Sequence, residues 1–195
     1  MQAKKLAVKL LLRQNICSID TDLFRLDCRG HIIIDSVQHY ARSVHRDPRD
    51  FIGECMSECV VFPRRGRHLI LYNDWILSSA RKRWSIAHEI GHICCCHTED
   101  GPDQEMQAND FAAELLMPQI VLLEAICAGL ICNAQDAASM FRVSLQAAQN
   151  QLRSANSPHH FGDLDYQLLQ KYLPLIDAKA CEPIITIPHR SFCQG

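Results

Sequence analysis

The chain has 195 residues and a mass of 22.2 kDa, which is enough for one domain of ordinary size with its own hydrophobic core. Hydrophobic residues make up 48% and charged residues 22%, so the composition excludes an intrinsically disordered chain. The net charge of −2 gives no electrostatic reason to expect a polyanionic partner.

The cysteines and the N-terminus bear on the cellular compartment. The eleven cysteines are odd in number and have no repeating spacing, which is not the pattern of a disulfide framework. Lys9 and Arg13 confine the N-terminal apolar run to residues 10–12. A signal peptide needs roughly 7–15 apolar residues and a transmembrane helix about 20. We therefore expect a cytoplasmic protein with reduced thiols and no membrane contact.

The first part of the chain is predicted to mix short helices and strands. Helices are expected at 2–14, at 21–29 up to a closing Gly30, from the capping Ser36 to Val44, and at 47–57, with a strand at 31–35. A β-hairpin follows, with strands at 59–62 and 68–72 joined by "PRRGR", in which Gly66 suits a tight turn. We interpret Cys55 and Cys59 as core thiols.

The rest of the chain is predicted to be helical. Helices are expected at about 80–97, with Ser78 or Ser79 as the N-cap, at 104–116, at 119–128 and, as a helical hairpin, within 134–153. A linker at 156–163, a helix at 164–172 and the short run "IITI" complete the chain. The sequence thus predicts a mostly helical α+β fold with a small β-sheet before the 80–97 helix. The expected domain spans 1–155, and 156–195 form a C-terminal tail with one helix.

The pentapeptide "HEIGH" is the strongest chemical signal. His88 and His92 are four residues apart, so on a helix their imidazoles lie about 40° apart and one turn along, within reach of one ion. Glu89 would lie beside that ion, where it can hold a water. This is the H-E-x-x-H pattern of two metal ligands and a general base.

A catalytic zinc site requires a third protein ligand. On a continuous helix His97 is turned about 140° from His92 and is expected to point away. Cys96 lies about 12 Å along the helix from His88, too far to share one ion. We therefore interpret the adjacent cysteines of "CCC" as packing residues.

Two carboxylates in the 104–116 helix compete for the third ligand position. Glu105 is predicted to stand within the apolar stripe formed by Ala112 and Leu116, one turn from Asn109. A carboxylate facing the core needs a cation, which a zinc ion held by two histidines would supply. Glu114 falls about 180° from Glu105 and is expected to be solvated, so that Glu114→Ala would change little. We predict Glu105 as the third ligand and Asn109 as a residue that orients Glu105 or a histidine.

These two segments resemble the ImmA/IrrE family of zinc-dependent metallopeptidases. In that family a hairpin ending in "YN" precedes a helix with R-x-x-F-[ST]-x-A-H-E-x-x-H, and the next helix carries E-x-x-x-N and then F-A-A-x-L-L-M-P. The resemblance is strong over 67–118 and looser back to about residue 20, with Trp84 where the family usually has Phe. The matching residues are "LILYND" (69–74), Arg81, His88, Glu89, His92, Glu105, Asn109 and "FAAELLMP" (111–118).

The resemblance implies a zincin-like fold in which His88, His92 and Glu105 bind Zn²⁺ and Glu89 is the catalytic base. The expected reaction is cleavage of a peptide bond by zinc-bound water that Glu89 activates. Known family members are bacterial or phage regulators that cleave or counteract a helix-turn-helix repressor, so a separate repressor is the implied substrate. The alternative function is a partner-binding anti-repressor with a zinc-organised cleft and no turnover.

Three further features have weaker signals. The 134–153 pair looks like a helix-turn-helix, but Arg153 is the only cation in its second helix, so we do not expect direct nucleic-acid binding. The strand at 68–72 is expected to form the rim of the cleft and to accept an extended substrate at a free edge. Tyr40, Tyr72 and His97 are candidates for stabilising the oxyanion by residue type only.

Overall fold

The computed structural model describes residues 2–53, 58–99, 101–155 and 160–181. Cys55, the end of the helix expected at 47–57, the first half of the expected linker and the run "IITI" lie outside these residues. The elements are α1 (Gln2–Leu12), a 3-10 turn η1 (Leu23–Arg25), β1 (Ile32–Ser36), α2 (Val37–Ser43), α3 (Arg49–Ile52), β2 (Cys59–Arg64), β3 (Arg67–Tyr72), α4 (Ser79–Cys94), α5 (Pro102–Leu116), α6 (Gln119–Cys127), α7 (Ala134–Phe141), α8 (Leu145–Ala155) and α9 (Asp163–Ala180).

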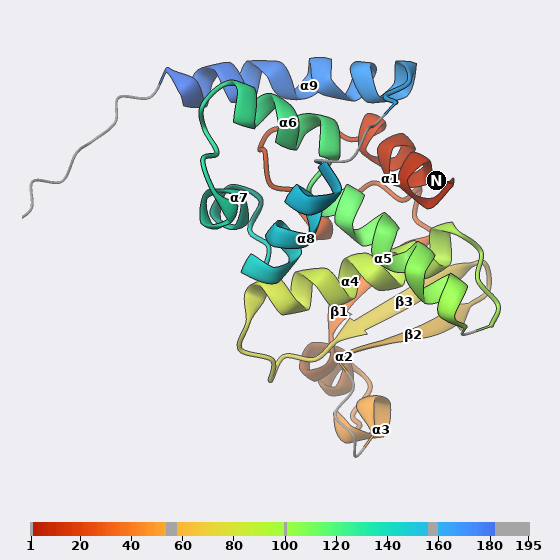
Figure 1. Cartoon of the computed structure of the whole chain (residues 1–195). Coiled ribbons are helices and arrows are strands. Elements are labelled where there is room, and N and C mark those ends of the chain that lie inside the picture. Colours follow the sequence, from red (N-terminus) through yellow and green to blue (C-terminus); the bar gives the residue numbers. More distant parts are fainter. Residues whose placement is uncertain (1, 54–57, 100, 156–159, 182–195) are drawn as a thin grey trace, which may run out of the picture.

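The elements stack in layers around a small sheet (Figure 1). Helices α2 and α3 lie on one face of the sheet, and the paired helices α4 and α5 lie on the other. Helices α1, α6 and α9 form the next layer beyond α5, while α7 and α8 pack beside α6. The prediction of a mostly helical α+β fold with its sheet before the "HEIGH" helix is confirmed.

The sheet has the strand order β1-β3-β2, with β1 parallel and β2 antiparallel to β3. The β2–β3 hairpin turns at Arg65 and Gly66, which have φ values of 37° and 80°. A two-residue turn with two positive φ angles matches the right-handed twist of the flanking strands, and glycine takes such an angle without steric cost. The hairpin predicted from "PRRGR" is therefore confirmed.

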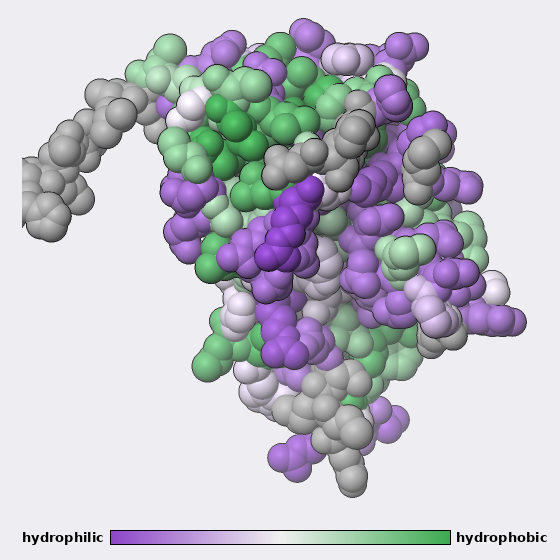
Figure 2. Space-filling model, in the orientation of Figure 1, coloured by the Kyte–Doolittle hydropathy of each residue, from purple (hydrophilic) through white to green (hydrophobic). Residues whose placement is uncertain are grey.

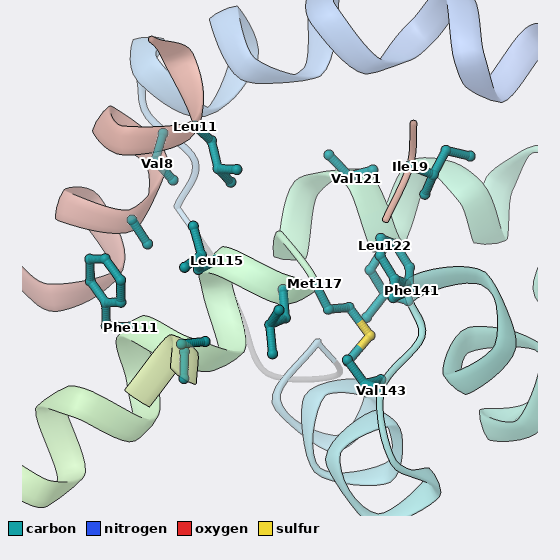
Figure 3. Close-up of a cluster of buried hydrophobic side chains, with 14 of the residues drawn as sticks. Val8, Leu11, Ile19, Phe111, Leu115, Met117, Val121, Leu122, Phe141 and Val143 are labelled. Carbon is teal, nitrogen blue, oxygen red and sulfur yellow. The ribbon is translucent and has the colours of Figure 1, made fainter. Parts of the chain in front are cut away.

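The main hydrophobic core lies between α1, α5, α6 and α7 (Figure 3). Val8 and Leu11 of α1 face Phe111 and Leu115 of α5, and all four side chains are at most 2% exposed. A second, smaller core joins α2 and α3 to the outer face of the sheet. Figure 2 shows that apolar side chains also reach the surface over α6, whose sequence "QIVLLEAIC" is apolar almost all round.

Helix α9 is longer than predicted and is tied to α1. It runs from Asp163 through Pro174 to Ala180, where the sequence predicted a helix only over 164–172. The Nζ atom of Lys171 donates hydrogen bonds to the carbonyl oxygens of Leu12 and Gln14, at 2.6 and 2.8 Å. The carbonyl of Leu12 is one that the end of α1 leaves without an intrahelical donor, so Lys171 of α9 caps α1 and also holds the turn that follows it.

The helix expected at 21–29 is wrong, because only the 3-10 turn η1 forms there. The carboxylate of Asp22 accepts a hydrogen bond from the backbone N–H of Phe24, and that of Asp27 accepts one from Arg29. Such local side-chain bonds compete with helical backbone bonds. The chain then turns through Arg29 and Gly30, both at positive φ.

Glu114 is not on a solvated face, contrary to the prediction. It is 4% exposed, because the C-terminal half of α5 is buried on nearly all sides. Its Oε1 accepts a hydrogen bond from the backbone N–H of Gln119, at 3.1 Å, and so satisfies the first turn of α6. Burial raises the pKa of the Glu114 carboxyl to about 7, although that hydrogen bond and the charge of Lys4 act in the opposite direction.

In the described part of the chain, no helix combines the length and the apolar character that a membrane crossing requires.

The burial of Glu114 predicts a pH-dependent stability. Because the pKa is about 7 in the folded protein and 4.5 for a model carboxyl, the folded state binds more protons between these values. The contribution of Glu114 to stability is therefore fully present below pH 4.5 and is lost as the pH rises through 7. Relative to Glu114→Gln, the wild type should lose about 3 kcal/mol of unfolding free energy over that range, measured by urea denaturation.

Glu114→Ala provides the second arm of the same measurement. It should destabilise the protein by about 1–3 kcal/mol at pH 5, because the N–H of Gln119 loses its acceptor in a buried position. Equal pH profiles for the wild type and Glu114→Gln would show that the carboxyl titrates as a solvated group.

Candidate metal centre

Helix α4 supplies two of the three groups that converge. Ser78 caps the helix through a hydrogen bond from the backbone N–H of Arg81 to its Oγ atom. Ile86, Ala87 and Ile90 bury one side of α4 in the main core. His88 and His92 lie on the other side, one turn apart, with side chains 17% and 15% exposed and Nε2 atoms 3.0 Å from each other.

Helix α5 supplies the third group. Glu105 places Oε2 at 3.3 Å from Nε2 of His88 and Oε1 at 3.3 Å from Nε2 of His92. The structure thus brings together the three residues that the sequence analysis selected. The reason given there was wrong, because the side chain of Glu105 is 49% exposed rather than turned to the core. The first turns of α5 extend past the core, and Glu105 reaches the histidines from the solvent side.

The geometry of these three groups fits a zinc ion. One ligand atom from each residue lies within 4.8 Å of the others. In a tetrahedral site with ligands about 2.0–2.1 Å from zinc, the ligand atoms stand about 3.3 Å apart, which matches the separations of 3.0–3.3 Å found here. Two imidazole nitrogens and one carboxylate also form the ligand set typical of catalytic zinc, which keeps a fourth position open.

Asn109 sets the proton position of one imidazole. Its Oδ1 atom lies 3.1 Å from Nδ1 of His88. Because an amide oxygen can only accept, Nδ1 of His88 is the donor in this contact, which leaves Nε2 available as a metal ligand. The sequence analysis left open whether Asn109 orients Glu105 or a histidine, and the contact is with His88.

Glu89 faces the beginning of strand β2. Its side chain is half-buried. Burial, and then the charges of Glu89 and Glu58, raise the pKa of the Cys59 thiol. Glu58 binds this part of the chain to α4 through an ion pair with Arg81 and a 2.5 Å hydrogen bond from Oγ of Ser85. The start of β2 therefore lies beside the histidine helix.

The strand expected to form the rim of the cleft was the wrong one. Strand β3 ("RHLILY") is the central strand and is paired on both sides, so it has no free edge for a substrate. Among the described strands, β1 and β2 are the edges, and β2 is the one that adjoins Glu89. Sequence order alone could not show this, because a hairpin does not reveal which of its strands pairs with β1.

His97 does not point away, contrary to the prediction. Its Nδ1 atom lies 3.1 Å from Nδ1 of His92, and the two rings meet nearly edge to face with centroids 5.0 Å apart. The prediction assumed that the helix continues to His97, whereas α4 ends at Cys94 and Cys96 has a left-handed conformation with φ of 58°. That conformation turns the chain back over the last turn of the helix.

The other oxyanion candidates have partners elsewhere. The hydroxyl of Tyr40 lies 2.5 Å from a guanidinium nitrogen of Arg64, and its ring packs against Phe51. Tyr72 packs edge-on against Phe24. These contacts give both tyrosines structural roles, in the outer core and beside η1.

The fold and the site together define a class of protein. A small sheet precedes a helix with His-Glu-x-x-His, and the following helix adds a carboxylate to the two histidines. Residues 20–153, more than half of the chain, match the model of a peptidase family described as the IrrE N-terminal-like domain (Peptidase_M78), and the chain belongs to this family. The family suggested by the sequence motifs is confirmed. No match was found among curated proteins.

The close approach of α4 and α5 at Gly91 provides a test of the site geometry. A Cβ atom at Gly91 would lie 3.1 Å from Cα and O of Ala108 and 3.2 Å from Cβ of Phe111. Two of these atoms are backbone, so Gly91→Ala must push α5 outward and carry Glu105 with it. We expect a loss of about 1–3 kcal/mol of unfolding free energy and weaker zinc binding.

Denaturation and a competitive zinc chelator measure the two effects of Gly91→Ala. Gly162→Ala is the matched control, since its Cβ would meet no atom nearer than 3.9 Å. Unchanged zinc affinity in Gly91→Ala would show that the spacing of the two helices does not set the ligand geometry.

Proposed function

We propose that this protein is a zinc-dependent endopeptidase in which His88, His92 and Glu105 bind the metal and Glu89 acts as the general base. The observation that carries the proposal is the convergence of two Nε2 atoms and one carboxylate at separations of 3.0–3.3 Å, in a chain that belongs to a peptidase family. Zinc, when bound, supplies a Lewis acid that polarises the peptide carbonyl and acidifies a water.

The protein's own residues account for the movement of protons. The carboxylate of Glu89 accepts a proton from the attacking water and then donates it to the nitrogen of the leaving amine. Glu89 is next to His88 in the helix, so it lies beside the site without being one of the three converging groups. The hydrogen bond of His88 to Asn109 keeps the proton on Nδ1 and holds the ring in place.

The free edge of β2 is the binding surface that we propose for an extended substrate. A peptide that pairs with β2 would gain backbone hydrogen bonds along the strand, independently of its side chains. Because β2 begins at Cys59, next to Glu89, a peptide on this edge would pass the base and the converging ligands.

The biological substrate that we propose is a regulatory protein, such as a separate helix-turn-helix repressor. This rests on the resemblance of the motifs to the ImmA/IrrE family. An extended loop or linker of such a protein would suit the edge of β2, since only extended backbone can pair with a strand. We also propose that the peptidase acts in the cytoplasm, where such a repressor would be found.

Metal binding is the first prediction from this proposal. Metal analysis should find about one zinc per chain, and His88→Ala, His92→Ala and Glu105→Ala should each weaken or abolish binding. Glu99→Ala is the matched control for Glu105→Ala, because Glu99 is an exposed carboxylate in the loop between the two helices. Stoichiometric zinc in the His88→Ala/His92→Ala double variant would place the metal elsewhere, with the cysteines as the obvious alternative.

Glu89→Gln separates catalysis from binding. The change keeps the shape of the side chain and removes the base, so zinc and partner binding should persist while hydrolysis is lost. The assay is mass spectrometry of new termini in a peptide library and in a purified repressor. Cleavage that survives Glu89→Gln would refute the role of Glu89. A wild type that binds the repressor through this cleft but cleaves nothing would instead be a partner-binding module.

A further inference from the structure

The end of helix α4 places a third histidine behind the proposed metal ligands. The backbone N–H of His97 donates to the carbonyl of His92 at 3.0 Å, and that of Cys96 donates to Ile93 at 3.1 Å. With Cys96 at φ of 58°, these bonds form a Schellman motif. The left-handed conformation is unfavourable for a residue that carries a Cβ atom, and it is what brings the imidazole of His97 back onto His92.

The tautomers of His92 and His97 follow from one requirement. If Nε2 of His92 binds zinc, it must present a lone pair, so the neutral ring carries its proton on Nδ1. That Nδ1 lies 3.1 Å from Nδ1 of His97, so the latter nitrogen must be the acceptor. The proton of a neutral His97 is then on Nε2.

Gln107 supplies the acceptor for the second ring nitrogen of His97. Nε2 of His97 lies 3.4 Å from the side-chain oxygen Oε1 of Gln107. This oxygen can accept a hydrogen bond from the N–H at Nε2. All hydrogen bonds thus run in one direction, from His92 to His97 to Gln107. In this series of hydrogen bonds, each ring nitrogen acts either as a donor or as an acceptor.

We propose that His97 is a positioning residue that fixes the tautomer and the ring orientation of His92. It does for His92 what Asn109 does for His88. The acceptors Asn109 and Gln107 both come from α5, the helix that also carries Glu105. Because the side chain of His92 is 15% exposed, little water reaches its ring to take the place of His97 as acceptor. This inference rests on the proposed zinc site.

Three substitutions of His97 test the inference through zinc affinity. His97→Phe and His97→Leu retain an apolar side chain and remove the acceptor, whereas His97→Asn places Oδ1 near the former position of Nδ1 and retains it. We expect His97→Phe and His97→Leu to weaken zinc binding by about 10–100-fold, the usual effect of losing a partner of a metal-binding histidine, and His97→Asn to restore most of the affinity. His39→Phe, on the outer helix α2, controls for the loss of an imidazole.

A spectroscopic readout is independent of affinity. Long-range proton–nitrogen correlation spectra of the zinc-loaded protein should show the proton of His92 on Nδ1 and that of His97 on Nε2. A purely structural role for His97 would not require this pair of tautomers. The opposite tautomer at His97 would overturn the inference.

The outcomes distinguish the inference from the proposed function. If the wild type takes up no zinc, the metal site fails and the role of His97 fails with it. If the wild type binds one zinc and His97→Phe and His97→Leu bind it equally tightly, only the role of His97 is overturned. If both variants lose the fold in metal-free thermal melts, His97 is a structural residue and the inference is likewise overturned.

Discussion

The approach of helices α4 and α5 at Gly91 and Ala108 is the contact on which the site depends. No single element carries the three converging groups, since two imidazoles belong to α4 and the carboxylate belongs to α5. The two backbones meet at Gly91 without an intervening side chain, and this close approach accompanies the separations of 3.0–3.3 Å between the ligand atoms. The same contact brings Asn109 and Gln107 within reach of His88 and His97. The same pair of helices thus contributes to the hydrophobic core on one side and carries the converging groups on the other.

Local periodicity was sufficient for most of the elements and for grouping much of the site. The four-residue spacings of His88 with His92 and of Glu105 with Asn109 each define one face of a helix, so these side chains could be grouped before any tertiary contact was known. The hairpin and the Ser36 and Ser78 caps follow from equally local rules. These features depend on residues that are near each other in sequence.

The errors arose where distant segments or unusual backbone conformations decide. Glu114 is buried because other parts of the molecule cover the far side of α5, which the periodicity of α5 alone does not reveal. His97 was misplaced because a left-handed conformation at Cys96 is not signalled by a glycine. The edge beside Glu89 belongs to β2 because β1, separated from the hairpin by two helices, occupies the other side of β3.

The hydrogen bonds of Lys171 to the end of α1 join α9 to α1, which packs against the helix that carries Glu105. Helix α1 lies before the family-matched segment and α9 lies after it, yet α1 covers Phe111 and Leu115 on the helix that bears Glu105. A fragment trimmed to the matched residues would expose this apolar side of α5 to water. The two motifs can be recognised in isolation, but the packing surface that covers their helix pair is supplied in part by segments that the motifs do not include.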